Sequence, residues 1–95
     1  MKVYEVGTFE KYEAGFHAFY RTLSEEKAKR VHELAKEMLS KIGELEFGAS
    51  DEESKKHYDL CRLIDIEFIE RSGIDFCLSS SANDCEIEMH SFDLD

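Results

Sequence analysis

The chain has no long run of apolar residues and no proline. Its first residues, MKVYEVGTFEKY, lack the apolar core of a signal peptide. No stretch approaches the roughly 18 apolar residues of a membrane span. We therefore expect neither export by the common routes nor insertion into a membrane, and we expect a cytoplasmic location. Average usage would give about five prolines in a chain of this length, and the sequence offers no structural explanation for their absence.

Cysteine occurs only three times, and this odd number fits free thiols better than a disulfide framework. No C-x-x-C or H-x-x-x-H spacing is present. The side chains that could bind a metal ion are His17, His32, His57, His90, Cys61, Cys77 and Cys85. Because a structural zinc site needs four such ligands at tight spacing, we predict no metal site. Cys77 and Cys85 are left as free thiols or a weak cross-strand pair.

Motifs for catalysis are missing as well. The five glycines stand isolated, so there is no phosphate-binding loop. His57 and Cys61 are the only base and nucleophile close together in the sequence, and no glycine-rich elbow accompanies them. We expect a protein that is not an enzyme and uses no cofactor. A small metal- or thiol-dependent enzyme using His57 and Cys61 is a second alternative.

Basic residues are scarce in the C-terminal part. The net charge of the 95 residues is −10, yet residues 1–58 hold 12 acidic and 10 basic side chains. Residues 59–95 hold 10 acidic side chains and only Arg62 and Arg71 as basic ones. Direct binding to nucleic acid or to an anionic membrane is disfavoured, since both require Lys and Arg. A basic protein partner is favoured instead.

What the sequence does contain is one clear amphipathic helix, predicted over 24–45. Its apolar residues recur at steps of three and four: Ala28, Val31, Ala35, Met38, Ile42 and Leu45. Ser24 can cap the first turn, where Glu25 and Glu26 suit the helix dipole. Gly48 is placed to end this helix as a C-terminal cap.

The N-terminal part predicts a short strand over 2–6 that ends at Gly7. A helix capped by Thr8 is predicted next, up to Leu23. Its aromatic and apolar residues follow helical spacing, and they are expected to form core: Phe9, Tyr12, Phe16, Phe19, Tyr20 and Leu23. Gly15 weakens this helix by about 1 kcal/mol relative to alanine.

The part that follows Gly48 predicts a third helix and then strands. Ser50 and Glu53 form a capping box, so a helix should begin there and end near 58–60. From Arg62 the alternation of apolar and polar residues predicts strands over 63–69, 74–78 and 85–89, joined by turns at 70–73 and 79–84. The competing interpretation is that the third helix continues to Ser72.

The predicted fold is a single two-layer α+β domain, residues 1–95, in the order β-α-α-α-β-β-β. A C-terminal meander of three antiparallel strands would pack one face on the helices, with the N-terminal strand as a candidate fourth member at one edge. The other face of the sheet would be solvated.

That solvated face would carry five carboxylates, which are the predicted partner-binding residues: Asp65, Glu67, Asp75, Glu86 and Glu88. Like charges facing one another across strands cost stability, which suggests that the protein uses their field. We expect the face to imitate nucleic-acid phosphates and to block a basic nuclease or nucleic-acid-binding protein. The competing interpretation is that these residues only solubilise the protein and protect the sheet edges.

A small, acidic domain of this kind is similar in type to the immunity proteins that neutralise bacterial toxins. It is also similar in type to phage-encoded inhibitors of host defence, including anti-CRISPR and DNA-mimic proteins. No residue motif carries this likeness, so no functional residues are transferred. The first alternative function is a structural or assembly module, a homodimer for example, that associates through the apolar faces of its helices.

Overall fold

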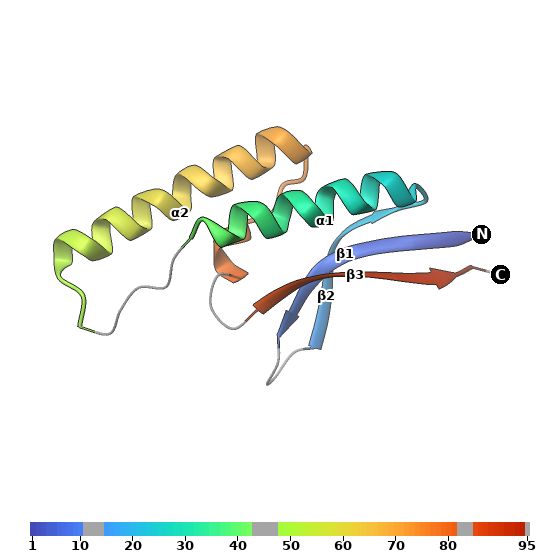
Figure 1. The fold of residues 1–95 in the computed structure, drawn as a ribbon, viewed down its shortest axis with the longest axis horizontal. Helices are drawn as coiled ribbons and strands as arrows, with labels where there is room; N and C mark the ends of the chain where they lie inside the picture. Colours follow the sequence, from blue (N-terminus) through green and yellow to red (C-terminus); the bar gives the residue numbers. More distant parts are fainter. Residues whose placement is uncertain (11–14, 43–47, 82–84, 95) are drawn as a thin grey trace.

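In the computed structural model of the chain, which describes residues 1–10, 15–42, 48–81 and 85–94, the elements follow one another as β-β-α-α-β (Figure 1). The strands are β1 (Lys2–Glu10), β2 (Gly15–Thr22) and β3 (Cys85–Asp93). The helices are α1 (Glu25–Ser40) and α2 (Asp51–Ser72), and a short 3-10 helix, η1 (Leu78–Ser81), precedes β3. The α+β class is confirmed. The predicted order with three helices is wrong.

The sheet has three antiparallel strands in the order β2-β1-β3. The N-terminal strand is therefore central, and the prediction that it lies at an edge is wrong. The predicted C-terminal meander is also wrong, since only β3 of its three strands is present in the described residues. The chain leaves the sheet after β2, forms both helices, and returns to pair β3 with the free side of β1.

The segment predicted as a helix after Thr8 contains the last residues of β1 and all of β2. An irregularity in the register between Val6 and Gly7 explains why its alternation is hidden. Val6 pairs with Tyr20, whereas Gly7 pairs with Ala18, so Phe19 is an extra residue in β2. As a result, Phe19 and Tyr20 both pack against the core although they are consecutive. Tyr12 lies outside the described residues.

Helix α1 confirms the prediction at its start and corrects it at its end. The Ser24 side chain accepts a hydrogen bond from the backbone N–H of Lys27 at 3.3 Å, which is the predicted cap. The predicted stripe of Ala28, Val31, Ala35 and Met38 is buried. The helix ends at Ser40 with Lys41 as its C-cap, so Gly48 is not the cap. Leu45 lies outside the described residues.

Helix α2 is the largest correction to the prediction. Ser50 accepts a hydrogen bond from the Glu53 N–H at 3.2 Å, and the helix that it caps runs to Ser72. Ile64 and Phe68, four residues apart, are buried, whereas Ile66 is 46% exposed. The strand over 63–69 is therefore wrong and the competing helix is correct. Gly73, predicted in a hairpin turn, ends the helix in the left-handed conformation (φ 73°).

The segment between α2 and β3 contains no strand in its described part. The predicted strand over 74–78 is replaced by a connection whose apolar residues Ile74, Phe76 and Leu78 still reach the core. Leu78 is fully buried and begins η1. Residues 82–84 of the predicted turn lie outside the described residues. Cys77 is consequently not on a strand opposite Cys85, so of the two alternatives for this pair the cross-strand one is wrong and Cys77 is a free thiol.

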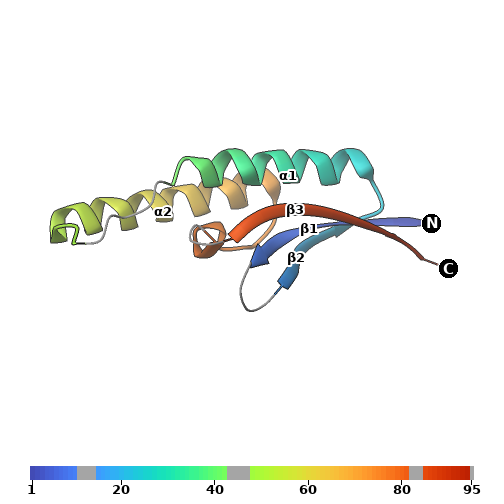
Figure 2. The same ribbon diagram turned by 60° about the horizontal axis from the view of Figure 1, so that its bottom comes forward.

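Both helices lie on the same side of the sheet (Figure 2). Val6 and Ile87 from the sheet, the buried stripe of α1, and Ile64 and Phe68 from α2 form one core. The rings of Phe19 and Phe68 meet edge to face with centroids 5.9 Å apart, and Phe19 stacks on Phe76 at 4.4 Å. No helix of the described chain covers the opposite side of the sheet, which we call the open face.

Candidate functional site: the open face of the sheet

Only two of the five predicted partner-binding residues lie on the open face. Ile87 and Met89 of β3 pack toward the helices, so by the alternation of a strand Glu86 and Glu88 lie on the other face. Glu86, near the start of this edge strand, also borders a groove of about 450 Å³ with Lys36 and Ser40 of α1. Asp65 and Glu67 lie on α2, and Asp75 lies in the connection after it. The expectation that all five share one sheet face is therefore wrong, because residues 62–72 are helical.

Around Glu88, the open face carries a row of charged side chains that crosses all three strands. Glu5 of the central strand lies opposite Arg21 of β2 and opposite His90 of β3. Arg21 forms an ion pair with Glu5. His90 Nε2 lies 2.8 Å from Glu88 Oε1. The charge of the Glu5 carboxylate is thus compensated by the Arg21 guanidinium. Glu86, further along β3, takes part in no ion pair among the described residues.

Aromatic rings lie beside these carboxylates. Phe9 and Phe16 were predicted to be core residues of a helix, but they lie on strands and are not part of the core. Phe16 stacks on His90 with ring centroids 3.9 Å apart. By register, Phe9 lies opposite both Phe16 and Glu86, and Phe92 on the same face of β3 is 41% exposed. Two β-prone runs around Phe9 and Phe16, separated by a polar stretch with Gly15, are a hairpin signal that could have revealed them.

Asp65 instead links the C-terminal half of α2 to η1 through hydrogen bonds. Its carboxylate accepts hydrogen bonds from the backbone N–H and the hydroxyl of Ser79, both at 2.6 Å, and from the Cys77 thiol at 3.3 Å. It therefore ties the connection after α2 to the helix itself. Because three hydrogen-bond donors surround it, the Asp65 carboxylate contributes mainly to the stability of the fold.

A groove of about 540 Å³ beside Asp65 contains the two residues considered for nucleophilic chemistry, His57 and Cys61. Burial, followed by the nearby Asp65 carboxylate, raises the pKa of the Cys61 thiol. No hydrogen bond joins His57 to Cys61 among the described residues. The groove therefore keeps Cys61 in the thiol form, which is the poorer nucleophile.

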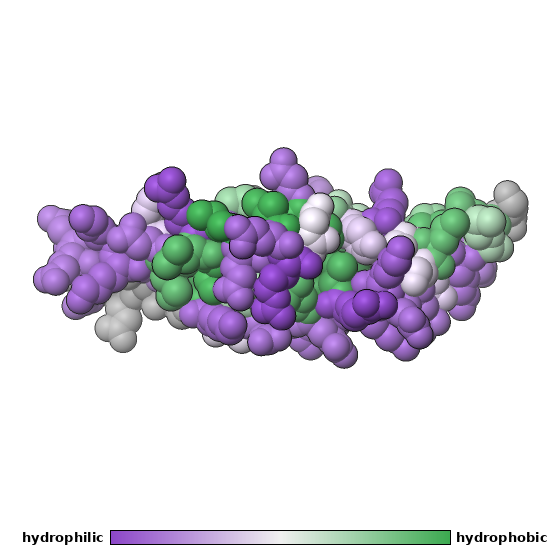
Figure 3. Space-filling view, turned by 90° about the horizontal axis from the view of Figure 1, so that it is seen from above, coloured by the Kyte–Doolittle hydropathy of each residue, from purple (hydrophilic) through white to green (hydrophobic). Residues whose placement is uncertain are grey.

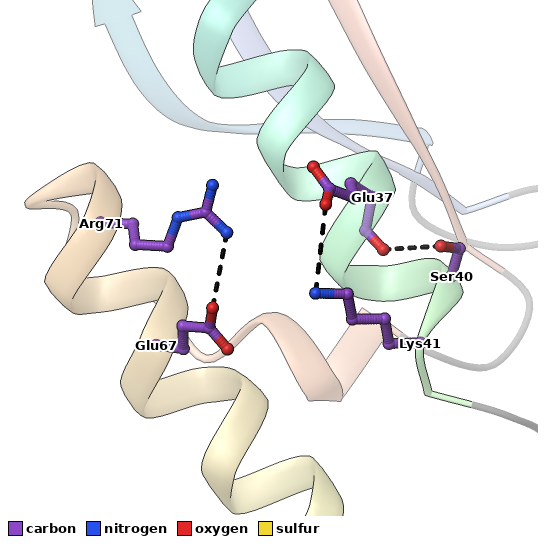
Figure 4. A network of polar contacts seen from close by, with 5 residues as sticks. All are labelled: Glu37, Ser40, Lys41, Glu67 and Arg71. Atoms are coloured by element: carbon purple, nitrogen blue, oxygen red, sulfur yellow. Dashed lines mark hydrogen bonds and ion pairs between the residues drawn. The ribbon is translucent and has the colours of Figure 1, made fainter.

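The other two reassigned carboxylates are ordinary surface groups. Glu67 pairs with Arg71 one helical turn away, with 3.4 Å between Oε1 and Nη1, as Figure 4 shows beside the Glu37–Lys41 pair of α1. Asp75 is exposed in the connection that follows α2. Neither contributes to a shared acidic surface with Glu86 and Glu88.

One groove on the helical side of the molecule is lined by basic residues. A groove of about 520 Å³ is bounded by β2, the first half of α1 and the end of α2, and Lys27, Arg30 and Arg71 line it. Tyr20 and Ser72 also line this groove.

In the described ranges, no three of the His, Cys, Asp and Glu side chains are grouped closely enough to bind a metal ion. Neither described helix has the length and apolar character needed to cross a lipid bilayer. Comparison of the chain with protein-family models, curated proteins and solved structures finds no match.

Proposed function

We propose that the open face is a protein-binding surface and that this chain inhibits a basic nuclease or nucleic-acid-binding protein. The observation that carries the proposal is the position of Glu86 and Glu88 on a sheet face that no described helix covers. Electrostatic complementarity would give fast association with a basic groove and discrimination against acidic partners. As an inhibitor of the immunity or anti-CRISPR type, the chain would act by occupying the surface of its partner that binds nucleic acid.

The aromatic residues of the open face support a protein partner. Interfaces are enriched in aromatic side chains surrounded by polar ones, and those rings dominate the binding energy. Phe9, Phe16 and Phe92 supply such rings next to Glu86 and Glu88. In this proposal the carboxylates set the rate and the specificity of binding, and the rings slow dissociation.

The proposal is tested by capture of partners from a lysate of the cells that carry the gene, with elution by a salt gradient and identification by mass spectrometry. The Glu86→Lys/Glu88→Lys variant is used in parallel. Because both reversed charges would face a basic groove, we expect the affinity for the captured protein to fall at least about a hundredfold, or roughly 2.7 kcal/mol.

The control is Glu33→Lys/Glu37→Lys, which changes the net charge equally on α1, on the other side of the sheet. This variant should retain the wild-type affinity within about twofold. Far-UV circular dichroism should show both variants folded. Equal loss of affinity in the two variants would mean that only the net charge matters, and full binding by the first variant would reject the open face as the site.

A further inference from the structure

The large apolar side chains that are exposed on the described helices all lie on α2. Tyr58 is 69% exposed, Leu63 65%, Ile66 46% and Ile69 36%. Figure 3, which looks at the molecule from above, shows hydrophobic side chains gathered among hydrophilic ones over the stretch that α2 occupies. Apolar side chains exposed in a contiguous row mark an interaction surface rather than the scattered residues of an ordinary surface.

The residues of this row have the spacing of a helix-pairing face. Leu63 and Ile69 lie three residues before and after Ile66, and Arg62 and Glu70 lie four residues before and after it. Residues three and four apart share one side of a helix. Ile64 and Phe68, which point into the core, are on the opposite side. One edge of the face centred on Ile66 borders the groove that contains His57 and Cys61, and no described helix covers the face itself.

The residues of this face are complementary to the same face of a second copy of α2 that runs in the opposite direction. If two copies of α2 cross antiparallel with Ile66 facing Ile66, then Leu63 of each copy lies level with Ile69 of the other. Arg62 of each copy lies level with Glu70 of the other. A twofold axis pairs residues in this reciprocal way. Neither Arg62 nor Glu70 forms an ion pair with any side chain in the described part of the chain, so both are available.

We propose that the chain forms an antiparallel homodimer through α2, with an Ile66–Ile66 contact flanked by two Arg62–Glu70 ion pairs. The shape of the molecule favours this arrangement. Its extents are 53 × 30 × 17 Å and its radius of gyration is 14.7 Å, against about 12 Å for a compact domain of this length. The first turns of α2 extend past the rest of the fold (Figure 1).

A charge-swap experiment tests the dimer and its register together. Sedimentation equilibrium is measured for the wild type, Arg62→Glu, Glu70→Arg and the double variant that carries both changes. Each single variant puts like charges level with each other twice per dimer, so we expect dissociation constants at least about tenfold higher. The double variant restores opposite charges, and its dissociation constant should return to within about threefold of the wild-type value.

Two further variants make the result decisive. Ile66→Asp puts two carboxylates at the centre of the interface and should leave only monomer, with far-UV circular dichroism confirming that it is folded. Glu33→Arg, on α1, is the control and should dimerise as the wild type does. A wild type that stays monomeric at millimolar concentration overturns the proposal. So does a dimer that is unaffected by Ile66→Asp, or a double variant that is not restored.

Discussion

At the scale of single residues, Gly7 decides how the first two strands meet. A β-carbon on Gly7 would overlap the carbonyl oxygen of His17 and lie 2.7 Å from the Ala18 Cα atom. These are backbone atoms of β2, which cannot rotate away as a side chain can. Position 7 therefore requires glycine because the two strands approach each other closely there. The backbone conformation is not the reason, since the φ angle of Gly7 lies outside the left-handed region.

We expect Gly7→Ala to lower the free energy of unfolding by at least about 2 kcal/mol, because the added carbon forces β1 and β2 apart. Urea denaturation followed by circular dichroism measures the change. Gly15→Ala is the matched control. Gly15 has φ 67°, and no atom of the described residues lies within 4 Å of an added β-carbon, so we expect only the strain of about 1 kcal/mol for a left-handed alanine. Equal losses in the two variants would contradict the pairing of Gly7 with Ala18.

Asp65 shows at the same scale why an acidic residue is not by itself a binding site. Its carboxylate oxygens accept three hydrogen bonds from Cys77 and Ser79, so they are occupied within the fold. Glu86 has no such donors among the described residues and remains available. Whether a carboxylate is structural or available depends on donors that are distant in the sequence, 12 to 14 residues away for Asp65.

At the scale of elements, α2 shows how two periodicities compete in one segment. Residues 62–70 alternate between apolar and polar as a strand does, yet the segment is helical. A strand would bury Ile64, Ile66 and Phe68 on one face. The helix buries Ile64 and Phe68 and exposes Ile66. The alternation arises because the helix is apolar on two sides, one facing the core and one facing outward.

This difference is measurable with two conservative substitutions in one helix. Ile64→Ala should lower the free energy of unfolding by about 2–5 kcal/mol, because it leaves a cavity in the core. Ile66→Ala should lower it by less than about 1 kcal/mol, as surface changes do. Both are measured by urea denaturation at concentrations low enough for the protein to be monomeric. Comparable losses would favour a strand, in which both side chains share the buried face.

At the scale of the whole molecule, the two proposed surfaces lie on different layers. The open face belongs to the sheet, and the Ile66 face belongs to the helical layer on the other side (Figure 2). A dimer through α2 would therefore leave both copies of Glu86 and Glu88 accessible. Two acidic faces in one particle would raise the apparent affinity for a partner with two sites, without any new contact.

We expect the two surfaces to respond independently. Arg62→Glu should leave the affinity of one open face for its captured partner within about twofold, and Glu86→Lys/Glu88→Lys should leave the dimer dissociation constant within about twofold, because distant sites are additive. Raising the salt concentration from 50 mM to 500 mM should weaken partner binding far more than dimerisation, since exposed charges are screened and apolar contacts are not. Isothermal titration calorimetry and sedimentation equilibrium measure the two responses. Strong coupling between them would show that one surface serves both functions.

Much of the local structure was predictable because it depends on residues that lie close together in the sequence. Ser24 and Ser50 cap helices by accepting hydrogen bonds from N–H groups three residues later, and no distant residue is needed for this. The buried stripe of α1 and the alternation of Ile87 and Met89 in β3 likewise reflect one face packed and one solvated. The strand over 2–6 was found, although β1 continues past Gly7 to Glu10.

The sequence by itself determined the α+β class, the two helix starts, the last strand, and the acidic Glu86 and Glu88 on one of its faces. Only the tertiary structure decided that β1 is central, that β2 exists, and that Asp65, Glu67 and Asp75 leave the sheet. The physical reason is that each of these depends on a partner far along the chain. The extra residue Phe19 is tolerated in β2 because its ring packs between Phe68 and Phe76, and no local pattern contains those contacts.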